Sequence, residues 1–247
     1  MEKEKLLLTS LLLICLCSCN KNKGEEINYN GAHEIKRGDS KDGLTHLDTP
    51  YYTYVDYYNL ESNGSLLMIP HFETYQQRLS YTCGACSAWM VLNYLDPVMG
   101  KTYNEGKVAT ECGSTGEGRG TSALQIANFF IAKDYEVEYS CSHEKVFTIY
   151  DEFVSFVKEH LQNQEPIMVD WATGSGHWTT IIGFDDMGND QASDDVLIFA
   201  DSSDSYDHFY DGYTITPARR FFSMWRETTP WDGEQIYLQQ YVIVKKK

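Results

Sequence analysis

Apolar residues recur at helical spacing in the stretch that follows Cys83. Positions 85, 88, 89, 92 and 95 are all apolar. Steps of three and four residues place such positions on one face of a helix, so the pattern predicts an amphipathic helix that faces a core. Cys83 lies at the N-terminal end of this predicted helix.

Further helices are predicted downstream by the same spacing and by their capping residues. Thr121 or Ser122 can cap a helix that continues through Lys133. A helix from about 150 to 161 would bury Phe153, either Phe156 or Val157, and Leu161. Residues 111–120, between the helix that follows Cys83 and the helix that continues through Lys133, are rich in glycine and predict a loop.

Strands are predicted mainly in the C-terminal half. Residues 135–139 and 166–170 are strand candidates, and the turn Gly174-Ser175-Gly176 leads into an apolar run that starts at His177. After an acidic turn, the run 196–201 predicts the partner strand of a hairpin and ends in the carboxylate of Asp201. Helices first and antiparallel strands later indicate an α+β fold.

The N-terminus has the pattern of a signal peptide. The run 6–16 spans eleven residues, which is too short to cross a bilayer and typical of a signal-peptide core. Cys19 follows the small residue Ser18, whereas Cys15 and Cys17 follow Ile14 and Leu16. We therefore expect a bacterial lipoprotein signal over 1–18 and lipidation of Cys19, with ordinary secretion as the alternative.

The region after Cys19 is polar and nearly without apolar periodicity, so residues 19–50 are predicted to be a tether. Residues 51–247 form one predicted domain, long enough to bury a core of its own. The expected location is the cell envelope, with a lipid anchor that holds the protein at the outer membrane or the cell surface. Glu25-Glu26 resembles a surface-export signal.

Composition narrows the possible partners. The formal net charge is −16 and the isoelectric point is about 4.7, which argues against nucleic acid as a partner. The acidic residues between 185 and 195 lack the spacing of an EF-hand loop, so hairpin turns are preferred to bound calcium. The glycine loop lacks the Lys-Ser/Thr of a P-loop. We expect no cofactor, no metal and a monomer.

The segment from Gln77 to Cys83 is the strongest signal for chemistry. Backbone N–H groups at a helix N-terminus favour a thiolate, so Cys83 is the candidate nucleophile. Gln77 lies six residues earlier and could donate its amide to an oxyanion. His177 is the candidate base and Asp201 the group that orients it. Asp204 competes for that third role.

Several alternatives compete with these assignments. Cys83 and Cys86 have the spacing of a thiol redox pair. Cys86 could itself be a nucleophile, but the residue six positions earlier is Ser80 instead of Gln. His208 is the alternative base, and Gln76 is the alternative oxyanion donor.

These motifs resemble those of the papain-like cysteine peptidases, and in particular the bacteriocin-leader-processing (double-glycine peptidase) type. Gln77, Cys83-Gly84 and Gly176-His177 match that pattern, as do Gly183-Phe184-Asp185 and Asp201. Ser202 follows Asp201 where the family more often has Pro. The resemblance covers roughly residue 66 to the C-terminus.

The resemblance implies a papain-like fold, with the nucleophile helix packed on an antiparallel sheet, and hydrolysis of peptide or protein substrates by Cys83, His177, Asp201 and Gln77. Acyl transfer on the same fold, as in a transglutaminase-like enzyme, thiol–disulfide exchange through Cys83 and Cys86, and peptide binding without cleavage are the alternatives. Among the other cysteines of the domain, a Cys112–Cys141 disulfide is expected.

Overall fold

The computed structural model describes residues 55–114, 120–171, 176–204, 210–226 and 236–245. The predicted signal (1–18), Cys19 and the tether (19–50) lie outside the described residues, as do His208 and Gly116 to Arg119 of the glycine loop. Among the described helices, none is both long and apolar enough to cross a membrane.

The elements follow the predicted order of helices before strands. The helices are α1 (Cys83–Leu95), α2 (Pro97–Gly100), α3 (Glu105–Cys112), α4 (Ala123–Ile131), α5 (Tyr150–Gln162) and α6 (Ala218–Met224), preceded by a 3-10 turn at Tyr57–Asn59. The strands are β1 (Leu66–Met68), β2 (Glu136–Ser140), β3 (Ile167–Trp171), β4 (His177–Asp185), β5 (Val196–Ala200), β6 (Tyr213–Pro217) and β7 (Tyr241–Lys245).

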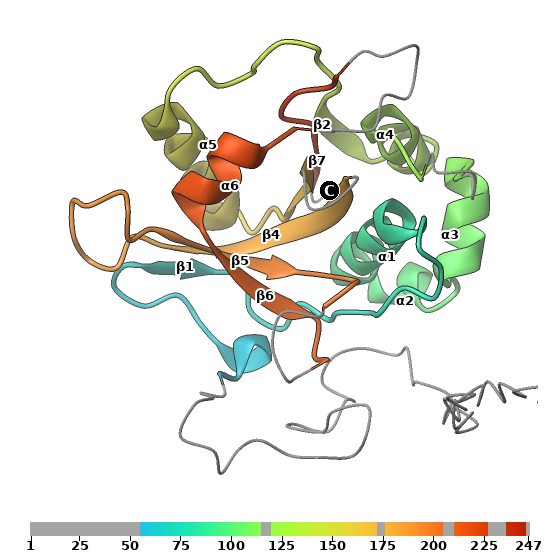
Figure 1. Cartoon of the computed structure of the whole chain (residues 1–247). Helices are drawn as coiled ribbons and strands as arrows, with labels where there is room; N and C mark the ends of the chain where they lie inside the picture. The colour runs from blue at the N-terminus through green and yellow to red at the C-terminus, as the bar shows by residue number, and fades with distance from the viewer. Residues whose placement is uncertain (1–54, 115–119, 172–175, 205–209, 227–235, 246–247) are drawn as a thin grey trace, which may run out of the picture.

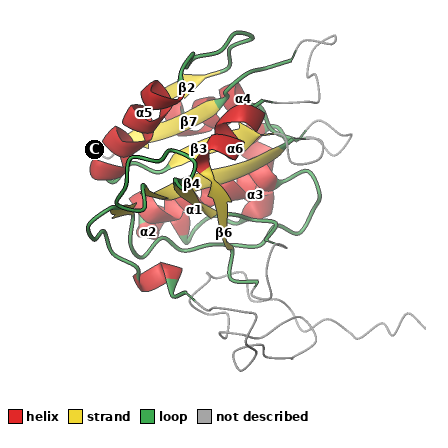
Figure 2. Cartoon of the chain, turned by 60° about the vertical axis from the view of Figure 1, so that its left-hand side comes forward, coloured by secondary structure: helices red, strands yellow, loops and turns green. Residues whose placement is uncertain are grey.

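The strands form one antiparallel sheet in the order β2-β7-β3-β4-β5-β6, and β1 pairs with the second half of β4. Figure 1 shows α1 to α4 grouped on the right of the view and α5 with α6 on the left, with strands running between them. Figure 2, with helices in red and strands in yellow, shows this arrangement from another side. This arrangement is the expected α+β plan, and it has the papain-like form.

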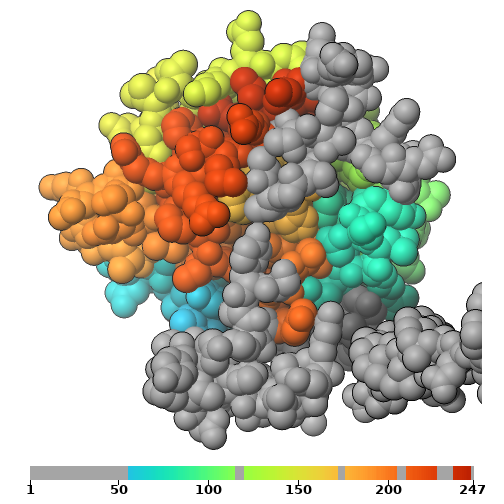
Figure 3. Space-filling model, viewed as in Figure 1, coloured from blue at the N-terminus to red at the C-terminus, as the bar shows by residue number. Residues whose placement is uncertain are grey.

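The helical part and the strand part lie side by side in space. On the face shown in Figure 3, the teal and green helical residues lie to the right of the orange and red residues of the C-terminal half. Helix α1 packs against β4, while α4 packs against β2 and β7. The nucleophile helix is therefore adjacent to the strand that begins with His177.

Helix α1 is buried almost all round, which goes beyond the one-sided pattern predicted from its apolar stripe. Every residue from Cys83 to Asn93 is buried, because α2, α3, α4 and β4 all pack around it. Small residues on its surface allow these close contacts. A Cβ on Gly84 would lie 2.9 Å from Cβ of Thr121 and 3.0 Å from Cδ1 of Trp178.

Two local expectations are settled by the structure. Ser122, and not Thr121, caps α4: its hydroxyl accepts from N–H of Gln125, and the Gln125 side chain accepts from N–H of Ser122. The glycine loop begins later than predicted, since Glu111 and Cys112 still belong to α3. Gly113 ends that helix in the left-handed conformation that glycine adopts readily.

The expected Cys112–Cys141 disulfide is wrong. Cys83, Cys86, Cys112 and Cys141 are all free thiols. Cys112 ends α3 and Cys141 follows β2, and α4 packs against both of these elements. Burial raises the pKa of Cys112 to about 12, which leaves it an unreactive thiol.

Candidate active site

Cys83 is the first residue of α1, as the apolar pattern predicted. Thr82 is the cap residue, and its carbonyl accepts the first bond of the helix from N–H of Cys86 at 2.8 Å. The amide groups of the first turn therefore point toward the start of the helix, where a thiolate gains from them. The residue is 8% exposed, so water is largely kept away from it.

The approach of α1 to β4 brings Cys83 to His177. Gly84 permits the close contact with Trp178, and the hydroxyl of Ser87 donates to the carbonyl oxygen of Trp178 at 3.3 Å. Trp178 also donates from Nε1 to the carbonyl oxygen of Thr121 at 2.8 Å. These contacts fix the start of β4, and with it the imidazole, next to the start of α1.

His177 lies between a carboxylate and the candidate nucleophile. Its Nε2 is 2.7 Å from Oδ1 of Asp201, which follows the neighbouring strand β5. With Nε2 occupied, Nδ1 is the nitrogen available to the hydrogen bond with the Cys83 sulfur. The competing Asp204 lies elsewhere: its Oδ2 accepts from N–H of Gly212 at 3.1 Å. The two nitrogens of the His177 ring thus have Asp201 and Cys83 as their partners.

The charge on the imidazole is strongly favoured. Burial alone would lower the pKa of His177, but the charge and hydrogen bond of Asp201, together with those of Cys83, raise it to about 10. Asp201 is 2% exposed, so its negative charge is poorly screened by water. At neutral pH the arrangement favours an imidazolium beside the sulfur.

Gln77 contacts Ser202, the residue that follows Asp201, and its side chain is held by two partners. Its Oε1 accepts from the Ser202 hydroxyl at 2.8 Å, and its Nε2 donates to the carbonyl oxygen of Leu79 at 2.8 Å. Its main-chain N–H also donates to the carbonyl of Ser202 at 2.7 Å. One amide hydrogen of Nε2 is left for an oxyanion. Gln76 instead donates to the carbonyl of Asp201 at 3.2 Å.

Cys86 has the environment of a structural thiol. It is fully buried, and its Sγ lies 3.3 Å from the carbonyl oxygen of Tyr75, to which it donates. Burial raises its pKa well above the usual value, and the negative charge of Glu105 adds to the shift. A thiol held protonated in this way is a poor nucleophile and a poor partner for thiol exchange.

The acidic segment after β4 makes turns. Asp185 accepts from N–H of Met187 at 2.8 Å, and Asp186 accepts from N–H of Gly188 at 3.1 Å and from Lys158 at 2.8 Å. In the part of the chain that the structure describes, no three His, Cys, Asp or Glu side chains come together as metal ligands would.

Sequence reasoning missed two residues around the site, Ser202 and Glu105. Ser202 was visible only as the residue that replaces Pro after Asp201, and its hydroxyl is what fixes the amide of Gln77. Glu105 lies in a stretch for which no helix was predicted, so nothing in the sequence connected it to residues 78–82.

Comparisons with solved structures give distant similarities. The peptidase domain of Streptococcus ComA, a bi-functional ABC transporter involved in a quorum sensing pathway, is 15% identical, with a TM-score of 0.46 over 72% of this chain and 100% of that domain. A double glycine motif protease from an AMS/PCAT transporter, in complex with the leader peptide, is 16% identical, with a TM-score of 0.41 over 70% of this chain and 91% of that one.

No curated protein is similar enough to the chain to count as a match. The family comparison is more informative, since residues 66–230 match the Peptidase_C39 like family. That range covers most of the domain, from β1 to just beyond α6, and includes Gln77, Cys83, His177 and Asp201. The chain therefore belongs to the Peptidase C39-like family of cysteine peptidases.

Proposed function

We propose that peptide hydrolysis by this cysteine peptidase proceeds through Cys83, His177 and Asp201, with Gln77 as an oxyanion donor. The observation that carries the proposal is the position of His177, which contacts Asp201 through Nε2 and interacts with the Cys83 sulfur on its other side. A nucleophile, a base and a group that orients the base are the three parts that covalent catalysis needs.

The first half of the reaction forms a thioester. The Cys83 thiolate attacks the peptide carbonyl carbon, and the carbonyl oxygen becomes an oxyanion. As this intermediate collapses, the His177 imidazolium gives its proton to the leaving amine, the C–N bond breaks, and the acyl group stays on sulfur. Asp201 keeps the ring oriented and stabilises its positive charge.

The second half releases the acyl group. Neutral His177 takes a proton from water, and the hydroxide attacks the thioester carbonyl. The carbon–sulfur bond then breaks, which frees a carboxylic acid and restores the thiolate and imidazolium. In both halves the oxyanion receives hydrogen bonds from Nε2 of Gln77 and from the Cys83 main-chain N–H, and such donors lower the barrier by roughly 3 kcal/mol each.

A pair of cysteine variants tests the assignment of the nucleophile. Cys83→Ala removes it, so cleavage of a mixed peptide library, followed by mass spectrometry, is expected to fall to background. Cys86→Ala is the matched control, because it removes a thiol one turn along α1 that is buried and bonded to Tyr75. Loss of cleavage in Cys86→Ala but not in Cys83→Ala would overturn the proposal.

The same experiment separates hydrolysis from acyl transfer. A thioester can be resolved by water or by an amine, so the products are compared with and without an added primary amine. Hydrolysis is expected to give free carboxylates in both samples. Products that carry the amine would move the enzyme to the acyl-transfer class.

We also infer that the protein is attached to a bacterial membrane outside the cytoplasm through lipid on Cys19. The apolar run 6–16 and the small residue before Cys19 support this inference. Growth with a labelled fatty acid is expected to label the wild-type protein and leave Cys19→Ser unlabelled. Cys17→Ser is the matched control, and loss of label in that variant instead would contradict the inference.

A further inference from the structure

Glu105 is a buried carboxylate next to the loop that joins Gln77 to Cys83. It is the first residue of α3 and is 7% exposed. A glutamate in the first turn of a helix is favourable for the helix dipole, but that role is normally filled at the surface. Burial of a charge is costly unless hydrogen bonds compensate it, so its partners indicate what it does.

Among the residues that the structure describes, the hydrogen-bond partners of the Glu105 carboxylate come from that loop. The main-chain N–H of Arg78 lies 3.0 Å from each carboxylate oxygen, and the N–H of Leu79 lies 3.4 Å from Oε1. The hydroxyl of Thr82, the cap residue of α1, contacts the same oxygen. The carboxylate therefore contacts the first two residues and the last residue of the segment 78–82.

The same loop holds the side chain of Gln77. The Leu79 carbonyl oxygen accepts from Nε2 of Gln77 at 2.8 Å and is also 2.8 Å from the Thr82 hydroxyl. The N–H of Leu79 faces Glu105 while its carbonyl faces Gln77. The orientation of this residue thus connects the carboxylate to the amide that is proposed to bind the oxyanion.

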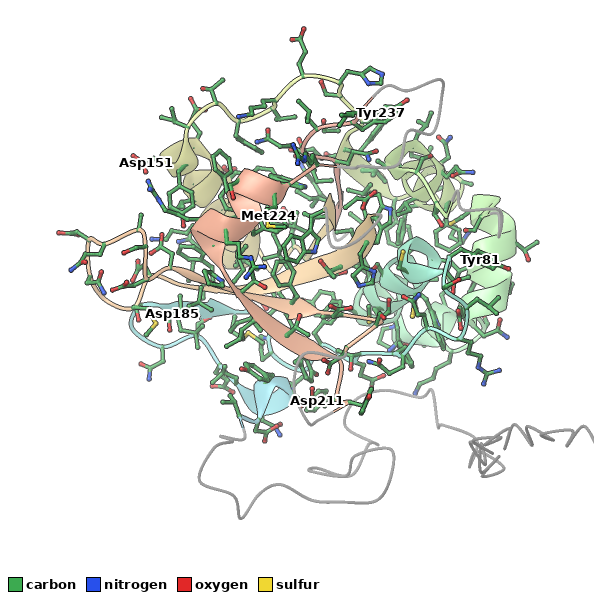
Figure 4. All side chains as sticks on the ribbon, in the orientation of Figure 1. Tyr81, Asp151, Asp185, Asp211, Met224 and Tyr237 are labelled. Atoms are coloured by element: carbon green, nitrogen blue, oxygen red, sulfur yellow. The ribbon has the colours of Figure 1, made fainter. Side chains whose placement is uncertain are left out.

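Packing on the outer side of the loop is incomplete. A cavity of about 610 Å³ lies there, and its lining includes Arg78, Tyr81, Thr82 and Glu105. Figure 4, in which Tyr81 is labelled, shows this part of the loop beside α1 and α3. Since side chains do not fill this space, the hydrogen bonds to Glu105, together with those that the Leu79 carbonyl accepts, hold this part of the loop.

An electrostatic role in activating the thiol does not explain this carboxylate. A negative charge near the start of α1 disfavours a thiolate, and Glu105 contributes in that sense to the raised pKa of Cys86. The benefit that offsets this electrostatic cost is the fixed position of the loop between Gln77 and Cys83.

We propose that Glu105 is a positioning residue, which fixes the segment from Gln77 to Cys83 so that both oxyanion donors meet the same oxygen atom. The inference rests on the proposed function. It predicts that Glu105 affects reactions that pass through an oxyanion and leaves other reactions of the same thiol nearly unchanged.

Two reactions of Cys83 separate these effects. Acylation by p-nitrophenyl acetate forms a tetrahedral oxyanion, and release of p-nitrophenolate reports its rate after subtraction of the Cys83→Ala background. Alkylation by iodoacetamide displaces iodide at carbon and needs no oxyanion donor. The ratio of the two rates cancels any change in the fraction of thiolate.

Glu105→Gln is the informative variant, because it keeps the shape but turns an amide toward main-chain N–H groups. We expect the acylation-to-alkylation ratio to fall about tenfold, with alkylation within about twofold of wild type. Glu111→Gln is the matched control: it lies on the same helix, is paired with Lys133, and should keep the wild-type ratio. An unchanged ratio in a folded Glu105→Gln protein would overturn the proposal.

A second pair of variants covers the case in which Glu105→Gln does not fold. Thr82→Val keeps the shape of the side chain but removes the hydroxyl that contacts Glu105 and the Leu79 carbonyl oxygen, whereas Thr82→Ser keeps that hydroxyl. The ratio is expected to fall about threefold in Thr82→Val and to return in Thr82→Ser. Equal ratios in these two variants would contradict the proposal.

The outcome also distinguishes this inference from the proposed function. If wild-type Cys83 is not acylated at all, the peptidase mechanism fails, and Glu105 has no oxyanion to serve. If wild type is acylated and the variants retain its ratio, only the role of Glu105 fails.

Discussion

Nε2 of His177 and Oδ1 of Asp201 lie 2.7 Å apart, and the carboxylate is almost completely buried. This pairing raises the pKa of His177 to about 10 despite the opposing effect of burial. The imidazolium is therefore the stable form beside Cys83 over most of the pH range in which proteins work.

Replacing Asp201 should move the alkaline limit of activity. In Asp201→Asn the charge that holds the proton on His177 is lost, so the limit in kcat/KM is expected to fall from near pH 10 toward the ordinary histidine value of about 6.5. The pH profile of peptide cleavage measures this.

Asp204→Asn is the control for that prediction, because Asp204 is equally buried but accepts from N–H of Gly212 instead of from the imidazole. It is expected to keep the wild-type alkaline limit. An alkaline limit that shifts in Asp204→Asn and stays in Asp201→Asn would assign the third role to Asp204.

Stability should decrease with rising pH because of His177. Its folded pKa of about 10 exceeds the unfolded value of about 6.5, so its contribution is complete below about pH 6.5 and disappears as pH rises through 10. Urea unfolding at about pH 6 and about pH 9 is expected to show a larger loss of unfolding free energy in wild type than in His177→Gln. Equal losses would contradict the raised pKa.

Ser202 should contribute to the rate through Gln77. Its hydroxyl donates to Oε1 of Gln77, which turns Nε2 away from Ser202, so Ser202→Ala is expected to lower kcat about tenfold while KM changes little. Ser203→Ala is the matched control, since that neighbouring side chain is exposed and its contact with Asp201 is made by the main chain. Steady-state kinetics on one cleaved peptide give kcat and KM for both variants. An equal loss of kcat in both variants would argue against this role of Ser202.

Gly84 is expected to be intolerant of any side chain. A methyl group there would press on Thr121 and Trp178 and push the start of α1 away from β4, so Gly84→Ala should cost about 1–3 kcal/mol of unfolding free energy. In Gly106→Ala, on α3, the nearest atom is 3.6 Å away, and the change should be neutral or stabilising. Thermal unfolding of the two variants tests this, and equal stability would show that the contact relaxes without cost.

The predictable part of the fold is the part with strong local patterns. The apolar stripe after Cys83 predicted α1, and the glycine turn, apolar run and acidic turn predicted the hairpin of β4 and β5. The short strands β1 and β6 were missed, and so was β7, although its run Tyr241-Val-Ile-Val is continuously apolar. Such short strands form because neighbouring strands supply their hydrogen bonds, and a single sequence does not show which segments are neighbours.

The same distinction applies to the site. Cys83, His177, Asp201 and Gln77 were named because each stands in a recognisable local context, and the structure brings them together. Their individual catalytic roles stay predictions. Ser202 and Glu105 make contacts across long separations in sequence: Ser202 contacts Gln77, and Glu105 contacts a loop 23 to 27 residues earlier. Contacts of that kind depend on how α3 packs against α1, which local patterns do not encode.

Alkylation of cysteines at different pH values tests whether His177 activates Cys83. A limiting thiol reagent is applied to wild type and to His177→Ala between about pH 5 and about pH 9, and peptide mapping assigns the modification. We expect rapid modification of Cys83 in wild type even at acidic pH, loss of that reactivity in His177→Ala, and little reaction at the buried Cys86 and Cys112. A Cys83 that reacts no faster than an ordinary thiol, whichever residue occupies position 177, would contradict it.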